Sequence, residues 1–246
     1  MYPRHTHGAK KAFTLIELVI VAAIITIVAT IALPKLMAAR LVANETAAIT
    51  SLRALITAQA LVQTQAHIDS DGDGTGEDGY FGELAGTAAL RASAGGVPAP
   101  GVHKLTPSVL SVAFGKIDAN GLVARSGYYF QLWLPGASVG GLTPGVAELP
   151  TAGGADPANM PDPSLCAYLW CCYAWPIDAG SSGTRAFFVN QRGDLLQFNN
   201  MRPNPYSGTA KQPNFDEAFV TLGDMGSKTR VGVSGGNDAT IWIDVK

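Results

Sequence analysis

Residues 13–33 read FTLIELVIVAAIITIVATIAL, and the rest of the chain is organised around this stretch. It is apolar apart from Glu17 and its threonines. As an α-helix it would be about 32 Å long, at about 1.5 Å per residue. That length matches the hydrocarbon core of a bilayer, which is about 30 Å thick. A carboxylate near the start of a membrane span is costly, so Glu17 is the first functional candidate.

A basic leader precedes the apolar stretch. Residues 1–12 contain Arg4, Lys10 and Lys11 and no acid. The positive-inside rule therefore predicts a cytoplasmic N-terminus and an exported remainder, in a protein that crosses the membrane once. The apolar run is longer than a secretory signal core of about 7–15 residues, and no A-x-A site follows it at once. A single-pass anchor is thus favoured over an ordinary cleaved signal peptide.

Residues 11–34, KAFTLIELVIVAAIITIVATIALP, resemble the N-terminus of type IV pilins and type II secretion pseudopilins. In that family a basic leader is removed before an aromatic residue, which is then methylated. The resemblance places this cut between Ala12 and Phe13 and the methylated amine on Phe13. It gives Glu17 a role in filament assembly and puts Pro34 where the family kinks its helix. Ala12 stands where the family usually has glycine.

The resemblance also implies a set of partners and a location. These are a prepilin peptidase, other pilin or pseudopilin subunits, the secretion or pilus assembly machinery and the inner membrane. After processing the chain would belong to a pilus or pseudopilus. Without the FTLIEL context, the same apolar run would suit a plain membrane anchor. The sequence does not separate a secretion pseudopilin from a major or minor pilin.

The helical pattern continues after Pro34 to about His67, with good helix formers throughout. Apolar side chains recur there at spacings of three, four and seven, which predicts one buried face. The positions are Leu41, Ala48, Leu52, Leu55 or Ile56, Gln59 and Val62. The expected organisation is a cleaved leader, a transmembrane or filament-core helix, an amphipathic helix and a globular exported domain, over residues 1–12, 13–34, 35–67 and 68–246.

Beyond the helix the sequence predicts strands. The aromatic run YYFQLWL and the segments RAFFVN and LLQFN, joined by a turn at Gly193, have strand composition. Expected strands cover residues 128–134, 166–175 and a hairpin over 185–199, with weaker ones at 218–222 and 240–245. A long helix followed by strands indicates an α+β fold, pilin-like, with the helix packed on an antiparallel sheet. Residues 127–136 and 173–197 also resemble a bacterial exported domain of uncharacterised function.

An acidic loop, DSDGDGTGEDGY, follows the helix. Asp69, Asp71 and Asp73 alternate before a glycine, as in the first half of an EF-hand-like calcium loop, and Thr75 and Glu77 extend the set. The bidentate acid of a full loop is missing, so Glu83 or a residue distant in sequence would replace it. The alternative is a solvated acidic turn, because Asp and Gly are common turn formers.

The three cysteines are Cys166, Cys171 and Cys172. In an oxidising periplasm one disulfide would leave one thiol over. Burial as small apolar thiols is the other interpretation. A zinc site would need a fourth ligand and paired spacing, and neither is visible.

The sequence carries no nucleophile, zinc-protease or P-loop motif, so no enzymatic activity is expected. The net charge of −2 shows no basic surplus, and nucleic acid is not an expected partner. The favoured function is a structural subunit of a pilus-like or pseudopilus filament. The alternative is a membrane-anchored, exported calcium- or ligand-binding module that does not polymerise.

Overall fold

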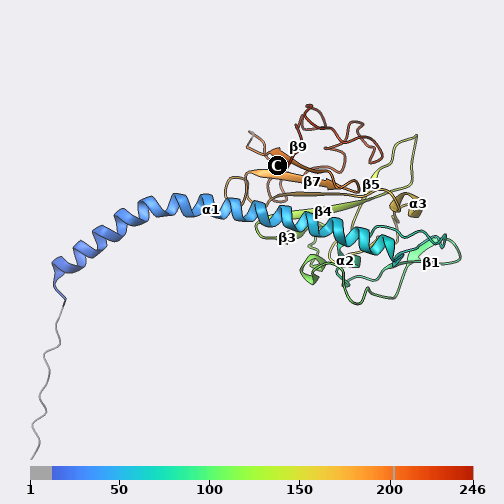
Figure 1. The fold of residues 1–246 in the computed structure, drawn as a ribbon, viewed down its shortest axis with the longest axis horizontal. Helices are drawn as coiled ribbons and strands as arrows, with labels where there is room; N and C mark the ends of the chain where they lie inside the picture. The colour runs from blue at the N-terminus through green and yellow to red at the C-terminus, as the bar shows by residue number, and fades with distance from the viewer. Residues whose placement is uncertain (1–12, 202, 246) are drawn as a thin grey trace, which may run out of the picture. The chain divides into compact units, whose positions relative to one another are not determined.

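The computed structural model describes residues 13–201 and 203–245. Its first element is a helix of 50 residues, α1 (Leu15–Thr64), which continues through Pro34 (Figure 1). The long helix expected from the sequence is therefore confirmed. The bend expected at Pro34 stays a prediction.

The chain divides into two compact units, residues 1–40 and 41–246, and the boundary falls inside α1. In the described part of the first unit, almost every side chain is exposed. Among the described residues, α1 is the one helix that is both long enough and apolar enough to cross a membrane. An apolar helix without a buried face lacks a partner within its own unit.

The second unit contains an antiparallel sheet, which in the described chain has seven strands. The strand order is β3-β4-β6-β7-β8-β9, and β5 pairs with the same side of β4 as β3 does. The strands are β3 (Val123–Arg125), β4 (Tyr128–Pro135), β5 (Gly145–Ala147), β6 (Cys171–Pro176), β7 (Arg185–Asn190), β8 (Leu195–Asn199) and β9 (Ile243–Asp244). The α+β fold class predicted from the sequence is confirmed.

Short elements connect α1 to the sheet and link its strands. They are α2 (Phe81–Leu84), the small hairpin β1 (Arg91–Ser93) and β2 (Pro98–Pro100), the 3₁₀ helix η1 (Val112–Gly115) and α3 (Pro163–Cys166). The hairpin β7–β8 turns at Gly193, whose φ of 75° favours glycine. This is the turn that the sequence predicted.

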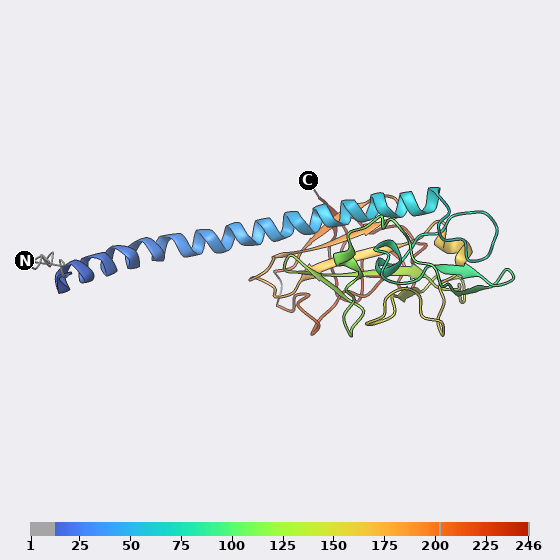
Figure 2. The same cartoon turned by 90° about the horizontal axis from the view of Figure 1, so that it is seen from below.

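The second half of α1 lies along one face of the sheet (Figure 2). Its apolar positions point into a core shared with β4, β6 and β7, where Phe130, Cys172 and Phe187 are buried. The buried residues of α1 are Glu45, Ala48, Ser51, Leu52, Leu55, Ala58, Gln59 and Val62, at spacings of three and four. Each fully buried leucine or valine contributes about 1.5–3 kcal/mol, so this stripe is a large part of the stability of the unit.

The opposite face of the sheet is covered by the C-terminal segment, orange to red in Figure 1, which has little regular structure. Tyr206, Phe219 and Trp242 of this segment pack on Tyr173 and Phe188 of the sheet. The ring centroids of Tyr173 and Trp242 are 5.6 Å apart and those of Phe188 and Phe219 are 5.5 Å apart, both edge to face. Such geometry suits aromatic quadrupoles and fixes a chain that makes few strand pairings.

Two sets of polar contacts fix the axial position of the second half of α1 within the second unit. The carboxylate of Glu45 accepts hydrogen bonds from the Thr184 main chain at 2.8 Å and pairs with Arg185 at 2.7 Å. Burial raises the pKa of Glu45, but the bonds from Thr184 and Arg185 outweigh that effect, and the net pKa is lowered. Further along, the amide of Gln59 donates to and accepts from the main chain of Gly79, at 2.8 and 2.9 Å.

Three strand predictions are wrong in whole or in part, and the strand expected over 240–245 is reduced to β9 at 243–244. Residues 166–170 do not join β6, because the Asp162 carboxylate accepts from the Leu165 main-chain N–H and Pro163 occupies the first turn, so α3 forms there instead. Residues 218–222 form no strand, and Phe219 makes only an isolated bridge to Thr229.

The packing of α1 predicts a large cost for truncating Leu52, which is fully buried. Leu52→Ala is expected to lower the free energy of unfolding by about 2–5 kcal/mol, through lost burial and the cavity that remains. Leu61, on the same helix, is 40% exposed. Leu61→Ala is the matched control and is expected to change stability by no more than about 0.5 kcal/mol. Denaturant unfolding of the full chain in nonionic micelles measures both, and equal losses would contradict the assigned face.

Candidate functional site

The first candidate site is the start of α1, where Thr14 and Glu17 form a reciprocal capping box. The main-chain N–H of Thr14 donates to Oε2 of Glu17 at 2.9 Å, and its hydroxyl donates to the same oxygen at 2.8 Å. In return, the Glu17 main-chain N–H donates to the Thr14 hydroxyl at 3.3 Å. The pattern T-x-x-E in the sequence is the signal for this motif, and the sequence analysis did not use it.

The carboxylate of Glu17 is only half used by these contacts. Both bonds from Thr14 reach Oε2, and Oε1 accepts no hydrogen bond in the described part of the chain. Phe13, next to Thr14, is 85% exposed. Side chains around the whole helix are exposed as well, among them Leu15, Ile16, Leu18, Ile20, Ile24, Ile27, Val28, Ile31 and Leu33. Glu17 is therefore a hydrogen-bond acceptor set in an apolar surface.

The second candidate site is the acidic loop. Asp69, Asp71 and Glu77 each offer an oxygen, and these oxygens lie within 4.8 Å of one another. Asp73, the other predicted carboxylate ligand, does not join this group and accepts instead from the main-chain N–H of Thr75 at 2.6 Å. Three of the five predicted ligands thus converge, which is an arrangement that oxygen-seeking Ca²⁺ fits.

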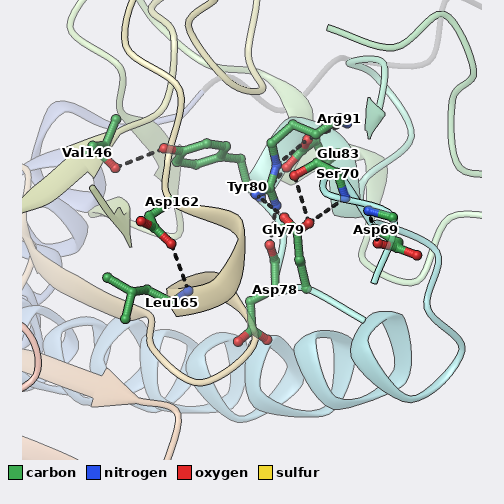
Figure 3. Close-up of polar contacts among 12 residues, drawn as sticks. Asp69, Ser70, Asp78, Gly79, Tyr80, Glu83, Arg91, Val146, Asp162 and Leu165 are labelled. Carbon is green, nitrogen blue, oxygen red and sulfur yellow. Dashed lines mark hydrogen bonds and ion pairs between the residues drawn. The ribbon is translucent and has the colours of Figure 1, made fainter. Parts of the chain in front are cut away.

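Glu77 also belongs to a buried ion-pair cluster (Figure 3). The Arg91 guanidinium contacts Oε2 of Glu77 at 2.8 Å and Oε1 of Glu83 at 3.1 Å, and all three side chains are almost fully buried. The Ser70 hydroxyl donates to Oε1 of Glu77 at 2.7 Å. Burial raises the pKa of Glu77, against the opposing effect of Arg91.

This cluster corrects one expectation for the loop. Glu83 does not replace the missing bidentate ligand, because its Oε1 faces Arg91 and its Oε2 accepts from the Tyr80 main chain at 2.8 Å. It closes the capping box of α2. A calcium ion would therefore be held by Asp69 and Asp71, with Glu77 shared between the ion and Arg91.

The three cysteines are free and buried. Cys171 and Cys172 are neighbours in β6 and point to opposite faces, so they belong to different core clusters. Burial raises the pKa of Cys166, which ends α3, to about 12. Such thiols are protonated at neutral pH and unreactive, so the structure corresponds to the interpretation of small buried side chains.

Comparison with known families decides the nature of the N-terminal segment. Residues 8–33 match the family model described as the prokaryotic N-terminal methylation motif. The N-terminus is of the type IV pilin and pseudopilin type. Phe13 and Glu17 lie inside the matched segment, as does Ala12, which falls outside the described residues together with the rest of the leader. Neither a curated protein nor a solved structure matches the chain.

The match covers the motif and no part of the second unit, residues 41–246. It indicates a substrate of the kind that prepilin peptidases process, and it points to a structural protein rather than an enzyme. With α1, it indicates an inner-membrane protein anchored by one span. The resemblance of the C-terminal region to an exported bacterial domain stays a prediction.

The motif predicts the N-terminus of the mature protein. We expect cleavage between Ala12 and Phe13, followed by methylation of the new amine. Intact-mass measurement and N-terminal sequencing of the membrane-extracted protein check this. A mature chain that begins at Met1, or one that is cut after the apolar run, would contradict the assignment.

The acidic loop predicts a calcium effect on stability. At a calcium concentration of about 100 times Kd, a ligand that binds only the native state adds about 2.7 kcal/mol, or roughly 5–11 °C in Tm. Asp71→Asn should abolish this shift, because it removes one converging carboxylate. Asp178→Asn, at an exposed carboxylate outside the loop, is the control. Melts of the full chain in micelles, with calcium and with chelator, measure the shift. An equal calcium-dependent shift of Tm in both variants would favour the alternative interpretation, in which the loop is a solvated acidic turn.

Proposed function

We propose that this chain is a structural subunit of a type IV pilus-like or type II secretion pseudopilus filament. The observation that carries the proposal is the methylation motif at residues 8–33, followed in the same helix by apolar side chains exposed on all sides. A membrane anchor needs only such an apolar surface. The motif adds a processing site and Glu17, neither of which anchoring requires.

The apolar part of α1 must be covered by something other than its own unit. Before assembly the hydrocarbon of the inner membrane covers it, with the leader on the cytoplasmic side and residues 41–246 in the periplasm. In the filament, the same side chains of neighbouring subunits take the place of lipid. The proposed partners in these steps are a prepilin peptidase, other pilin-like subunits and the assembly machinery.

Glu17 is the group that makes assembly selective. An unpaired carboxylate in apolar surroundings costs several kcal/mol or takes up a proton. Cleavage creates a cationic amine on Phe13, at nearly the same depth as Glu17. The amine of one subunit pairs with Oε1 of Glu17 in its neighbour, which the capping box leaves open. Pairing stabilises the joined subunits and fixes their axial register.

Three variants separate charge from helix capping. Glu17→Gln preserves the T-x-x-E/Q capping pattern and the side-chain shape but removes the charge. Glu17→Leu removes both, and Thr14→Ala removes the capping hydroxyl but leaves the carboxylate. We expect all three to be inserted and cleaved. Sheared filaments should fall at least about tenfold for both Glu17 variants, which corresponds to about 1.4 kcal/mol, whereas Thr14→Ala should assemble nearly as well as the parent chain.

The yield of sheared filaments from cells with a compatible assembly machine is the measurement, normalised to processed protein in the membrane. Normal filaments from Glu17→Leu would refute the charge-pairing mechanism. Absence of filaments from the parent chain itself, with normal processing, would favour the alternative function. That alternative is an anchored, exported calcium- or ligand-binding module, and the convergence of Asp69, Asp71 and Glu77 is the observation in its favour.

A further inference from the structure

A cavity of about 270 Å³ opens on the exported unit, away from the segment that carries the methylation motif. Its wall is formed by the second half of α1, the chain that follows α3 and the turn between β7 and β8. The residues that matter for its chemistry are Gln59, Gln63, Asp78, Tyr168, Trp170 and Gln191. All belong to the same compact unit.

Asp78 is the unusual member of this wall. It is 3% exposed, yet its carboxylate makes no hydrogen bond or ion pair with any described residue. Its main chain is fully engaged, since the N–H donates to the carbonyl of Cys166 at 2.9 Å and the carbonyl accepts from Arg91. Figure 3 shows the carboxylate pointing away from the Arg91 cluster, on the side of α1. The Asp78 oxygens are not among the fully inaccessible side-chain atoms that lack a partner, so they reach the cavity and are open to a donor from outside the chain.

Several polar groups of the wall are already paired. The Gln59 amide is paired with Gly79, the Gln63 amide donates to the carbonyl of Ala167, and the Gln191 side chain accepts from the Trp170 main chain. No lysine, arginine or histidine is among the residues that line the cavity. The charged group of the lining is thus an anion, and the aromatic side chains of Tyr168 and Trp170 line the same cavity, where aromatic faces favour a cation.

A second acidic feature adjoins the cavity. Tyr168 and Ala167 also line a smaller cavity of about 70 Å³, whose other residues include Asp71, Asp73 and Thr75 of the acidic loop. Tyr168 is 67% exposed and stands where the two cavities meet. Carboxylates therefore lie on both sides of one exposed aromatic side chain, which suits a ligand with a cation at each end of an apolar chain.

We propose that the Asp78 cavity binds an alkylammonium group, with the ammonium on Asp78 and the alkyl chain against Ile56, Ala60 and the aromatic rings. Three donors of an ammonium satisfy the open carboxylate, and the apolar wall accepts the methylenes. The cavity is smaller than a drug-sized pocket of about 300–1,000 Å³, which suits a diamine or a lysine side chain. Both sources present the same group, and the experiment distinguishes them.

The test is calorimetric titration of the full chain in nonionic micelles. Cadaverine is the diamine probe, N-acetyl-lysine amide represents a lysine side chain, and pentanediol is the uncharged analogue of cadaverine. We expect cadaverine or the lysine derivative to bind and pentanediol not to bind. Whichever of these two compounds binds more tightly identifies the source of the alkylammonium group, a diamine or a lysine side chain. Asp78→Asn should weaken binding by about tenfold or more, through loss of a charge-assisted hydrogen bond. Asp178→Asn, at an exposed carboxylate outside the cavity, should bind as the parent chain does.

Three results would overturn the proposal. They are equal binding of pentanediol and cadaverine, unchanged binding in Asp78→Asn, and no binding of either cation. If Asp78→Asn fails to fold, the comparison of cadaverine with pentanediol on the parent chain decides, and equal affinities overturn the proposal. None of these measurements involves filament assembly, so the outcome is independent of the function proposed above.

Discussion

The packing of one face of α1 on the antiparallel sheet is the interaction on which the second unit, residues 41–246, depends. Leu52, Leu55 and Val62 close one side of the sheet and share a core with its central strands. An apolar stripe repeats along a helix, so burial alone leaves the axial position weakly specified. The Glu45–Arg185 pair and the Gln59–Gly79 bonds remove this freedom, because each polar group has a partner in only one register.

Arg91 has a comparable role for the loop that follows α1. One buried guanidinium pairs with Glu77 and Glu83 and also binds the carbonyl of Asp78, so the end of the acidic loop and α2 meet on it. Its donors toward carboxylates are directed to the glutamates, and the Asp78 side chain is left to face the cavity. The same geometry therefore accounts for an ordered acidic loop and for a buried carboxylate without a partner. The order of the acidic loop and the candidate ligand site at Asp78 both follow from the way Arg91 pairs with the two glutamates.

Local periodicity accounts for what the sequence predicted well. The helix, the strand over 128–135 and the hairpin over 185–199 each carry their pattern within a short window. The methylation motif, which contains Phe13 and Glu17, was also predictable because it is contiguous in the sequence. The burial of Arg91 carries no local signal, since a charged residue in a Gly- and Ala-rich segment reads as surface. The Asp78 cavity was equally hidden, because distant parts of the chain form its wall.

Glu17 caps the start of α1, and in the proposed filament the same side chain also makes the assembly contact. A carboxylate that entered an apolar environment with both oxygens bare would bear the full desolvation cost. The capping box reduces that cost, because Oε2 already accepts two bonds from Thr14 inside the same chain. Oε1 keeps its capacity to accept, and in the proposed filament the amine created by cleavage is the matching cation. Helix capping thus prepares the assembly contact without completing it, and completion waits for a second, processed subunit.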